Sequence, residues 1–169
     1  MDAESLPAVE ALPLSYPQSA DGFRRSGVAA AVAEFHATFT LPFQTQPSIN
    51  VEPSLEILRV TLLEEEVGEL IIAMNARDLA GIADALADIT YVVYGTALTY
   101  GIDLDAVLGE VHRSNMSKLD HDGKPILRAD GKVLKSELYS PPDVAAVLHR
   151  QAARSDGGDV TFTTVLPRS

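Results

Sequence analysis

Residues 58–74 read LRVTLLEEEVGELIIAM, an apolar segment interrupted by EEEVGE, which runs from Glu64 to Glu69 and holds four carboxylates in six positions. The spacing of the leucines around this stretch predicts a helix. An exposed helix face normally sets Lys or Arg three or four residues from its acids, because such pairs stabilise a helix and like charges destabilise it. Arg59 lies five residues before Glu64 and Arg77 eight after Glu69, so neither is at a neutralising spacing. We therefore expect the positive charge to come from outside this helix.

Composition limits the class of protein. The 169 residues suffice for one domain with its own core, and the absence of cysteine excludes a disulfide framework and a thiolate zinc site. The apolar runs are far shorter than the roughly 20 residues of a membrane span, and the start, MDAESLPAVEAL, lacks a basic leader. We expect a cytoplasmic protein without a membrane partner. The net charge of -11 opposes binding to a nucleic-acid polymer, so an anionic ligand needs local cations.

The distribution of Pro, Gly and apolar residues divides the chain into three parts. Residues 1–26 have no sustained period and are expected to form a loose N-terminal arm, whereas residues 27–153 form the folded domain. Residues 154–169 form a C-terminal tail, either disordered or an added strand, with no identifiable partner in the chain.

Helical periodicity dominates the folded domain. The predicted helices are 27–39, 54–77, 82–100 and 104–119, with residues 42–53 as an extended connection. We expect Ser54 and Asp103 to cap the N-termini of the second and fourth helices, and Gly101 stands where the C-terminal cap of the third is expected. Short turns between amphipathic helices favour antiparallel neighbours, so the sequence predicts a helical bundle.

The end of the domain has a different pattern. Asp-Gly-Lys occurs at 122–124 and again at 130–132, which predicts a short hairpin or a pair of turns. Two prolines after Ser140 are expected to open a last helix that ends near Ala153. The expected fold class is therefore all-α, an antiparallel helical bundle with a short β-hairpin-like or irregular C-terminal extension.

The acidic stretch is matched by acids on the following helix. Glu65 and Glu66 lie four and three residues before Glu69, so the three carboxylates share one helix face. Asp84 and Asp88 are again four residues apart. With the turn near residue 78, a rise of about 1.5 Å per residue puts Glu69 and Asp88 at the same height of a hairpin.

The turn at Gly101 is expected to bring a third helix to this level. The same estimate of height places Asn115 opposite Asp88. Asn115 belongs to HRSNMSK, residues 112–118, which ends the helix and supplies basic and polar groups for a phosphate site: Arg113, Asn115, Ser117 and Lys118. Three helices are thus expected to converge.

Such a convergence of carboxylates indicates a divalent cation. Carboxylate oxygens are hard ligands suited to Mg²⁺ or Mn²⁺, which often bind through a few carboxylates and the phosphates of a substrate. The metal would be the missing cation, and two ions with substrate bound would serve an in-line displacement. The alternative, a solvated acidic face, explains the polarity but not the absence of Lys and Arg. A di-iron carboxylate bundle is disfavoured, because none of the four histidines has a Glu three residues before it.

The motifs in combination resemble a known family. They are FHATF, LLEEEVGEL, DALADITYVVYG, SNMSK and DGKVLKSELYSPPD, all within about residues 30–145. The chain resembles the all-α nucleoside triphosphate pyrophosphohydrolases, the MazG-like and phosphoribosyl-ATP pyrophosphohydrolase-like group, and most closely the MazG-like dUTP pyrophosphatases. The resemblance implies Mg²⁺-dependent cleavage between the α- and β-phosphates, with dUTP as the expected substrate. It also implies a homodimer, since members usually work as dimers or larger assemblies.

The resemblance also implies the metal ligands. It assigns Mg²⁺ to Glu66, Glu69 and Asp88. The second signature of the family is Glu-x-x-Asp, whereas the residue three before Asp88 is Ala85. We expect Asp84, four residues before Asp88, to have taken over as a ligand of a second ion or of a bound water.

The remaining site residues follow from the same comparison of motifs. Glu65 is expected to act as a base or as a ligand of the second metal ion. The expected catalytic residues are Glu65, Glu66 and Lys118, and the expected phosphate-binding residues are Arg113, Asn115, Lys118, Lys132 and Lys135. Lys132 and Lys135 would close over the phosphates from the same chain or from the partner subunit. Tyr91, Tyr94 and Tyr100 are interpreted as core or dimer contacts.

Other functions are compatible with the sequence. Within the same class, the enzyme could hydrolyse a broad range of nucleoside triphosphates, dCTP or phosphoribosyl-ATP. The alternative from another class is a non-catalytic helical interaction module, whose acidic face would meet a basic partner protein and which would need no metal.

Overall fold

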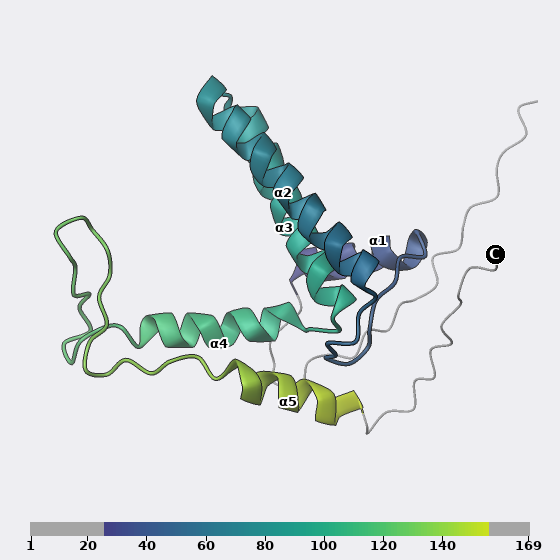
Figure 1. Ribbon diagram of the computed structural model, residues 1–169. Helices are drawn as coiled ribbons and strands as arrows, with labels where there is room; N and C mark the ends of the chain where they lie inside the picture. Colours follow the sequence, from purple (N-terminus) through teal and green to yellow (C-terminus); the bar gives the residue numbers. More distant parts are fainter. Residues whose placement is uncertain (1–25, 156–169) are drawn as a thin grey trace, which may run out of the picture.

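The computed structural model describes residues 26–155, which form five α-helices and no strand (Figure 1). The helices are α1 Gly27–Thr38, α2 Pro53–Ala76, α3 Leu79–Thr99, α4 Leu104–Met116 and α5 Val144–Ser155. The prediction of an all-α fold is confirmed. The predicted arm, residues 1–26, lies outside the described residues except for Ser26, and so does the predicted tail after residue 155.

The long helices α2 and α3 pack against each other as an antiparallel hairpin (Figure 1). Arg77 ends α2 in the left-handed conformation with φ 54°, and the Asp78 carboxylate accepts from the Ala80 N–H to cap α3. This cap explains why α3 begins earlier than the predicted residue 82. The prediction of Ser54 as the cap of α2 is wrong: Pro53 already lies in the helix, where its missing N–H costs nothing.

Helix α1 crosses the hairpin near the end of α3 and fixes it to the rest of the molecule. Val32 and Ala33 are fully buried there. The Ser26 N–H and hydroxyl both donate to the Asp105 carboxylate at the start of α4, at 2.7 and 3.0 Å, and the Tyr94 hydroxyl of α3 donates to it at 2.7 Å. One buried carboxylate therefore joins α1, α3 and α4.

The turn after α3 requires glycine. Gly101 has φ +68°, and a Cβ there would lie 2.0 Å from the Gln46 carbonyl oxygen. The connection between α1 and α2 packs against this turn. The Gln44 N–H donates to the Leu98 carbonyl and the Ser48 N–H donates to the Tyr100 carbonyl, both at 3.0 Å. The predicted role of Gly101 at the end of the helix is therefore confirmed.

Helix α4 does not return along α3. It diverges from the hairpin and packs on α5, so the predicted antiparallel placement of α4 on α3 is wrong (Figure 1). The physical reason is that the start of α4 is held by Ser26 through Asp105, whereas Gln151 of α5 bonds to the Asp103 N–H and carbonyl at 3.1 and 3.0 Å. The molecule thus has two arms, α2 with α3 and α4 with α5.

The segment between α4 and α5 carries the predicted paired turns. Leu127 and Val133 form a single antiparallel bridge, and Gly131 turns the chain with φ 86°. Helix α4 ends at Met116, three residues before the predicted end. Helix α5 begins at Val144 rather than at the prolines, because the Asp143 carboxylate caps it by accepting from the Ala146 N–H at 2.9 Å.

Glu110 ties the two helices of the second arm together. Its carboxylate accepts two hydrogen bonds from the Arg113 guanidinium, at 2.9 and 2.7 Å, and one from the Asp143 N–H at 2.8 Å. These bonds lower the pKa of Glu110 to about 2, the Arg113 bonds having the largest effect. Because they favour the ionised form, the carboxylate stabilises the folded state above the ordinary pKa of 4.5, and this contribution is lost as the pH falls towards 2.

We therefore expect the free energy of unfolding of the wild type to fall more steeply between pH 4.5 and about 2 than that of Glu110→Gln. Urea unfolding at a series of pH values measures this, with Glu34→Gln, an exposed acid of α1, as the control that keeps the wild-type slope. Parallel pH profiles for wild type and Glu110→Gln would contradict the assignment.

The apolar core of the described residues is small. The buried hydrophobic residues are Val32, Ala33, Ala73, Ala85, Ala97 and Val147. Many larger aliphatic side chains of α2 and α3 are exposed instead. None of the described helices is both long and apolar enough to cross a membrane.

Candidate functional site

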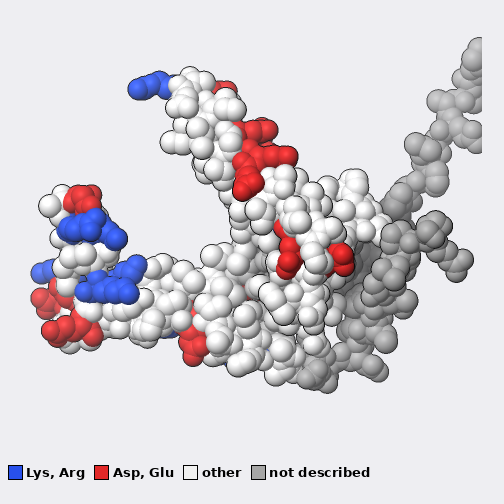
Figure 2. All heavy atoms as spheres, viewed as in Figure 1, with Lys and Arg blue, Asp and Glu red and all other residues white. Residues whose placement is uncertain are grey.

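The predicted acidic residues gather on the arm formed by α2 and α3 (Figure 2). Glu65, Glu66 and Glu69 lie on α2, and Asp84 and Asp88 lie on α3. Burial raises the pKa of Glu66, and the negative charges of Asp88, Glu69, Glu65 and Asp84 raise it further, in that order. The structure thus brings the other four predicted acids within electrostatic reach of the Glu66 carboxylate.

Glu66 lies at the centre of this acidic cluster. Its Oε2 atom is buried and has no hydrogen-bond partner among the residues that the structure describes. Such an orphaned oxygen is costly, because a buried carboxylate oxygen has lost water without gaining a donor. No cation is among the groups that shift its pKa. The sequence predicts that the positive charge comes from outside α2. Within residues 26–155, no cation acts on Glu66.

Arg59 is not that cation, although it lies two turns before Glu66 on α2. It is 8% exposed, and its Nε donates to the Thr99 hydroxyl of α3 at 3.0 Å. Its Nη1 and the Nε2 of buried His36 both crowd Gly95, where a Cβ would lie 3.3 and 3.0 Å from them. The guanidinium therefore joins α2 to α1 and α3.

The acidic cluster suits a hard divalent cation in its chemistry. It offers only carboxylate oxygens, the donors that Mg²⁺ and Mn²⁺ prefer, and one of them is already stripped of partners. Within residues 26–155 no three His, Asp or Glu side chains converge tightly enough to form a complete metal site. The residues therefore fit such an ion by charge and donor type, with phosphates and water left to supply further ligands.

The irregular second signature has a structural explanation. Ala85 is 3% exposed, whereas Asp84 and Asp88 on either side are exposed. A carboxylate at position 85 would be directed into the packed side of α3 and would need a partner there. The negative charge of exposed Asp84 instead raises the pKa of Glu66.

The predicted phosphate-binding residues lie at the other end of the molecule. The Lys118 ammonium donates to the Asn115 side chain at 2.7 Å, just after α4. Arg113 is engaged by Glu110 and also donates to the Pro141 carbonyl at 3.0 Å. Lys132 is exposed, with its backbone N–H donating to Asp130.

Tyr139, which the sequence did not single out, interacts with Lys135 and is affected by the charge of Lys118. The Lys135 ammonium lies 4.1 Å from the centre of the Tyr139 ring. A hydrogen bond with Ser114 lowers the pKa of the Tyr139 hydroxyl most, followed by the hydrogen bond and charge of Lys135 and the charge of Lys118. The one signal in the sequence was that Lys135 and Tyr139 are four residues apart. This spacing implies contact in a helix, but the segment that holds the two residues is not helical.

The expected convergence of Glu69, Asp88 and Asn115 on one level is wrong within a single chain. Glu69 and Asp88 share the α2 and α3 arm, but Asn115 lies near the far end of α4, which diverges from that arm. Figure 2 shows acids along the upper arm and most Lys and Arg beyond α4, where further acids lie among them. One copy of the chain therefore does not bring both halves of the predicted site together.

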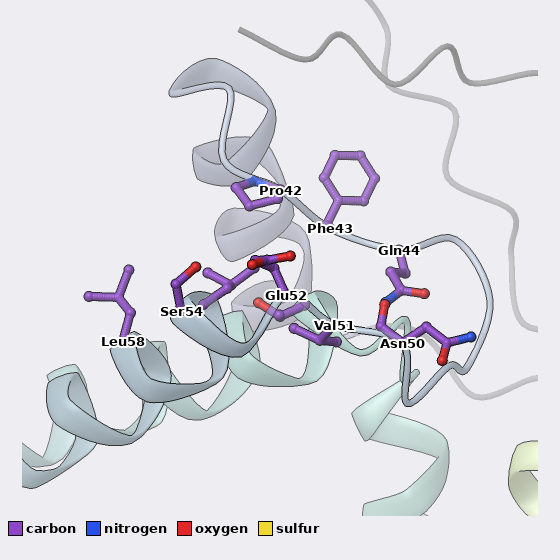
Figure 3. Close-up of a pocket in the computed structure, with 10 residues that line it drawn as sticks. Pro42, Phe43, Gln44, Asn50, Val51, Glu52, Ser54 and Leu58 are labelled. Carbon is purple, nitrogen blue, oxygen red and sulfur yellow. The ribbon is translucent and has the colours of Figure 1, made fainter.

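A cavity of about 650 Å³ lies apart from both groups (Figure 3). It lies between the connection that precedes α2 and the first turns of that helix, and none of the predicted site residues lines it. Its walls include Phe43, Asn50, Glu52 and Leu58, and buried Thr99 closes it from α3.

All three predicted tyrosines, two on α3 and one directly after it, make contacts within the chain. Tyr94 donates to Asp105, and Tyr100 donates to Glu56 at 3.0 Å. Tyr91 packs edge-on against Phe35 of α1, with ring centres 5.6 Å apart. Of the two interpretations, the structure favours core contacts for these residues.

Comparisons with known proteins agree with the motifs. The family model of phosphoribosyl-ATP pyrophosphohydrolase matches residues 32–115. The uncharacterized protein L479 of Acanthamoeba polyphaga mimivirus is 39% identical over 146 residues, which cover 78% of this chain and 56% of that protein. The chain thus spans about half the length of this curated relative.

A solved structure from Exiguobacterium sp. 255-15, described as a candidate NTP pyrophosphohydrolase, is 23% identical and covers 79% of this chain and 98% of its own, with a TM-score of 0.43. That score is too low for the likeness to define the site. The family match, by contrast, spans the acidic cluster, Ala85 and Asn115. Over residues 32–115, which include α2, α3 and all but the last residue of α4, this chain is similar to the phosphoribosyl-ATP pyrophosphohydrolase family.

Proposed function

We propose that this protein is a Mg²⁺- or Mn²⁺-dependent nucleoside triphosphate pyrophosphohydrolase that converts dUTP to dUMP and pyrophosphate and so cleans the nucleotide pool. The observation that carries the proposal is the buried, unpartnered Oε2 atom of half-buried Glu66, surrounded by four further acids without a cation. The match of residues 32–115 to the family model supports the reaction class. The preference for dUTP rests on the resemblance of the motifs to the MazG-like dUTP pyrophosphatases.

Glu66, Glu69 and Asp88 would hold the principal ion, with Asp84 and Glu65 beside a second. A divalent cation bound there would neutralise charge on the phosphates and lower the pKa of a bound water. Glu65 is exposed and can accept the proton of the attacking water as a general base. The water is added across the bond between the α- and β-phosphates as that bond breaks. The products are the monophosphate and pyrophosphate.

The basic residues at the end of α4 would bind the phosphates. Lys118 and Asn115 are already oriented by their mutual hydrogen bond, and Lys135 lies beside them at Tyr139. Lys132 is exposed and free to close over the ligand. Arg113 contributes its charge from the side, since its guanidinium is held by Glu110.

A homodimer would complete the site, because the acids and the lysines lie on arms that diverge within one chain. The face that a second copy would cover is aliphatic, since several large apolar residues of the hairpin are exposed. The most exposed are Ile57 68%, Val60 57%, Ile71 54%, Ile72 69%, Met74 58% and Leu79 79%. Exposed apolar side chains gathered on one helical hairpin favour an interface, and two-fold dimers are the commonest assembly.

A nucleotide panel assayed with Mg²⁺ is the most informative test of this function. We expect dUTP to give dUMP and pyrophosphate in equal amounts, and chelation of the metal to stop the reaction. The panel includes the other nucleoside triphosphates, dCTP and phosphoribosyl-ATP, which separates a dUTP enzyme from a broad one. Release of orthophosphate from every substrate would refute the reaction type.

The non-catalytic interaction module makes the opposite prediction about metal. Calorimetric titration with Mn²⁺ and a nucleotide separates the two functions, because the enzyme should bind the ion at the acidic cluster. Glu69→Gln should weaken that binding, whereas Glu64→Gln, on the same helix but absent from the groups that act on Glu66, should not. An unchanged titration in Glu69→Gln would show that the site is misplaced.

A further inference from the structure

Lys118 and Lys135 share a polar surface without a counter-ion. The ion pairs among residues 26–155 are Arg113 with Glu110 and Arg128 with Asp130, so neither lysine has a carboxylate partner there. Nevertheless the segments that carry them lie together: the hydroxyl of Ser136, next to Lys135, donates to the Leu119 carbonyl at 2.7 Å and lies 3.4 Å from the Ser117 carbonyl, on either side of Lys118. Two like charges drawn to one place are unfavourable unless something compensates them. A polyanion bound between them would do so.

Tyr139 is the residue that draws Lys135 to this place. The Lys135 ammonium lies over the face of the ring, 4.1 Å from its centre, which is a favourable cation–π geometry. Ser114, which is 3% exposed in the last turns of α4, lowers the pKa of the hydroxyl of the same residue most, and Lys135 lowers it further. The ring therefore holds Lys135, while its hydroxyl interacts with the helix that leads to Lys118.

The backbone around Tyr139 is fixed to α4 independently of its side chain. The Ser140 N–H donates to the Ser117 hydroxyl at 2.9 Å, and that hydroxyl donates to the Ser114 carbonyl at 2.7 Å. The Ser136 hydroxyl donates to the Leu119 carbonyl at 2.7 Å. Because these bonds remain when the Tyr139 side chain is changed, its removal should free Lys135 without detaching the segment.

We propose that Tyr139 is a positioning residue, which holds Lys135 beside Lys118 so that the two ammonium groups together bind a pyrophosphate group. The ligand class is an inorganic or nucleotide polyphosphate, because each of the two ammonium groups can then bind the oxygens of a different phosphate group. The assignment of this surface to the substrate rests on the proposed function. The binding of pyrophosphate itself needs neither turnover nor the acids of α2 and α3.

The test uses the full chain and inorganic pyrophosphate, titrated calorimetrically at low ionic strength with a chelator present. We expect the wild type to bind and Tyr139→Leu to raise the Kd about tenfold, since ring and hydroxyl are both lost. Tyr139→Phe keeps the ring and should lie between the two. Lys124→Met, which removes an exposed lysine of the neighbouring turn, should leave the Kd unchanged.

A double-mutant cycle distinguishes positioning from a structural role. If Tyr139 acts through Lys135, then Tyr139→Leu should have no further effect on the Kd when Lys135 is already Met. Additive losses in the two variants would overturn the proposal, and so would wild-type binding by Tyr139→Leu or a wild type that does not bind pyrophosphate. Failure of dUTP hydrolysis with an intact cycle would instead refute the proposed function and leave this surface in place.

Discussion

Replacing Asp88 by Asn is expected to lower metal-dependent pyrophosphate release by more than about a hundredfold. Replacing a residue that only contacts a metal ligand usually costs less than this. The reason is that Asp88 is the acid whose charge acts most strongly on Glu66. Asp84→Asn should lower turnover roughly tenfold to a hundredfold and leave one ion bound. The fold should survive both changes, because each removes a like charge from a repulsive cluster.

The measurements are pyrophosphate release and bound Mn²⁺ per subunit for the two variants. Glu64→Gln is the matched control, since it removes an acid of the same stretch that does not act on Glu66. Thermal unfolding without metal confirms that the variants are folded. A fully active Asp84→Asn enzyme would show that Asp84 is only a surface acid and that Ala85 marks the loss of one ligand without replacement.

The acidic cluster could be predicted because it depends on local rules. The rise of a helix and one short turn decide which residues of α2 face which residues of α3, and the Asp78 cap fixes that turn within one residue of the estimate. The estimate paired Glu69 with Asp88, and the charges of both raise the pKa of Glu66. Ala85 was visible as a departure from the family motif, but its burial between exposed Asp84 and Asp88 needed the structure.

The direction of α4 could not be predicted from turn length. It depends on contacts between residues far apart in sequence, above all the bonds from Ser26 to Asp105, which are 79 residues apart. No periodicity in the sequence encodes such a contact. The estimate that Asn115 faces Asp88 assumed that a short turn reverses the chain, and Gly101 instead directs it away while the Gln46 carbonyl fills the adjacent space.

The basic half of the site was predicted by residue but not by arrangement. SNMSK and the later lysines stood out as phosphate ligands, whereas their meeting at Tyr139 depends on contacts such as Ser117 with Ser140, 23 residues apart. Conversely, Arg113 looked available in the sequence but is held by Glu110 and Pro141. Side-chain pairing of this kind decides which cations remain for a ligand.

Two variants that are inactive alone are expected to regain activity when they form a heterodimer. If the acids of one subunit work with the lysines of the other, Asp88→Asn and Lys118→Ala should each be inactive as homodimers. A heterodimer of the two, purified through a different tag on each chain, contains one site with both defects and one intact site. It should therefore recover about half of the wild-type activity, as two-fold symmetry requires.

The control pairs Asp88→Asn with Glu66→Gln, two defects on the same arm, so that neither site of the heterodimer is intact and no activity returns. Recovery only in the first pair would place Lys118 and the acidic cluster on different subunits, as expected from the divergence of α4 from the hairpin. An inactive first heterodimer, or a fully active monomer in sedimentation at micromolar concentration, would require α4 to fold back along α3 within one chain. The bonds that hold Asp105 to Ser26 and Tyr94 would then have to break, because they direct α4 away from the acids.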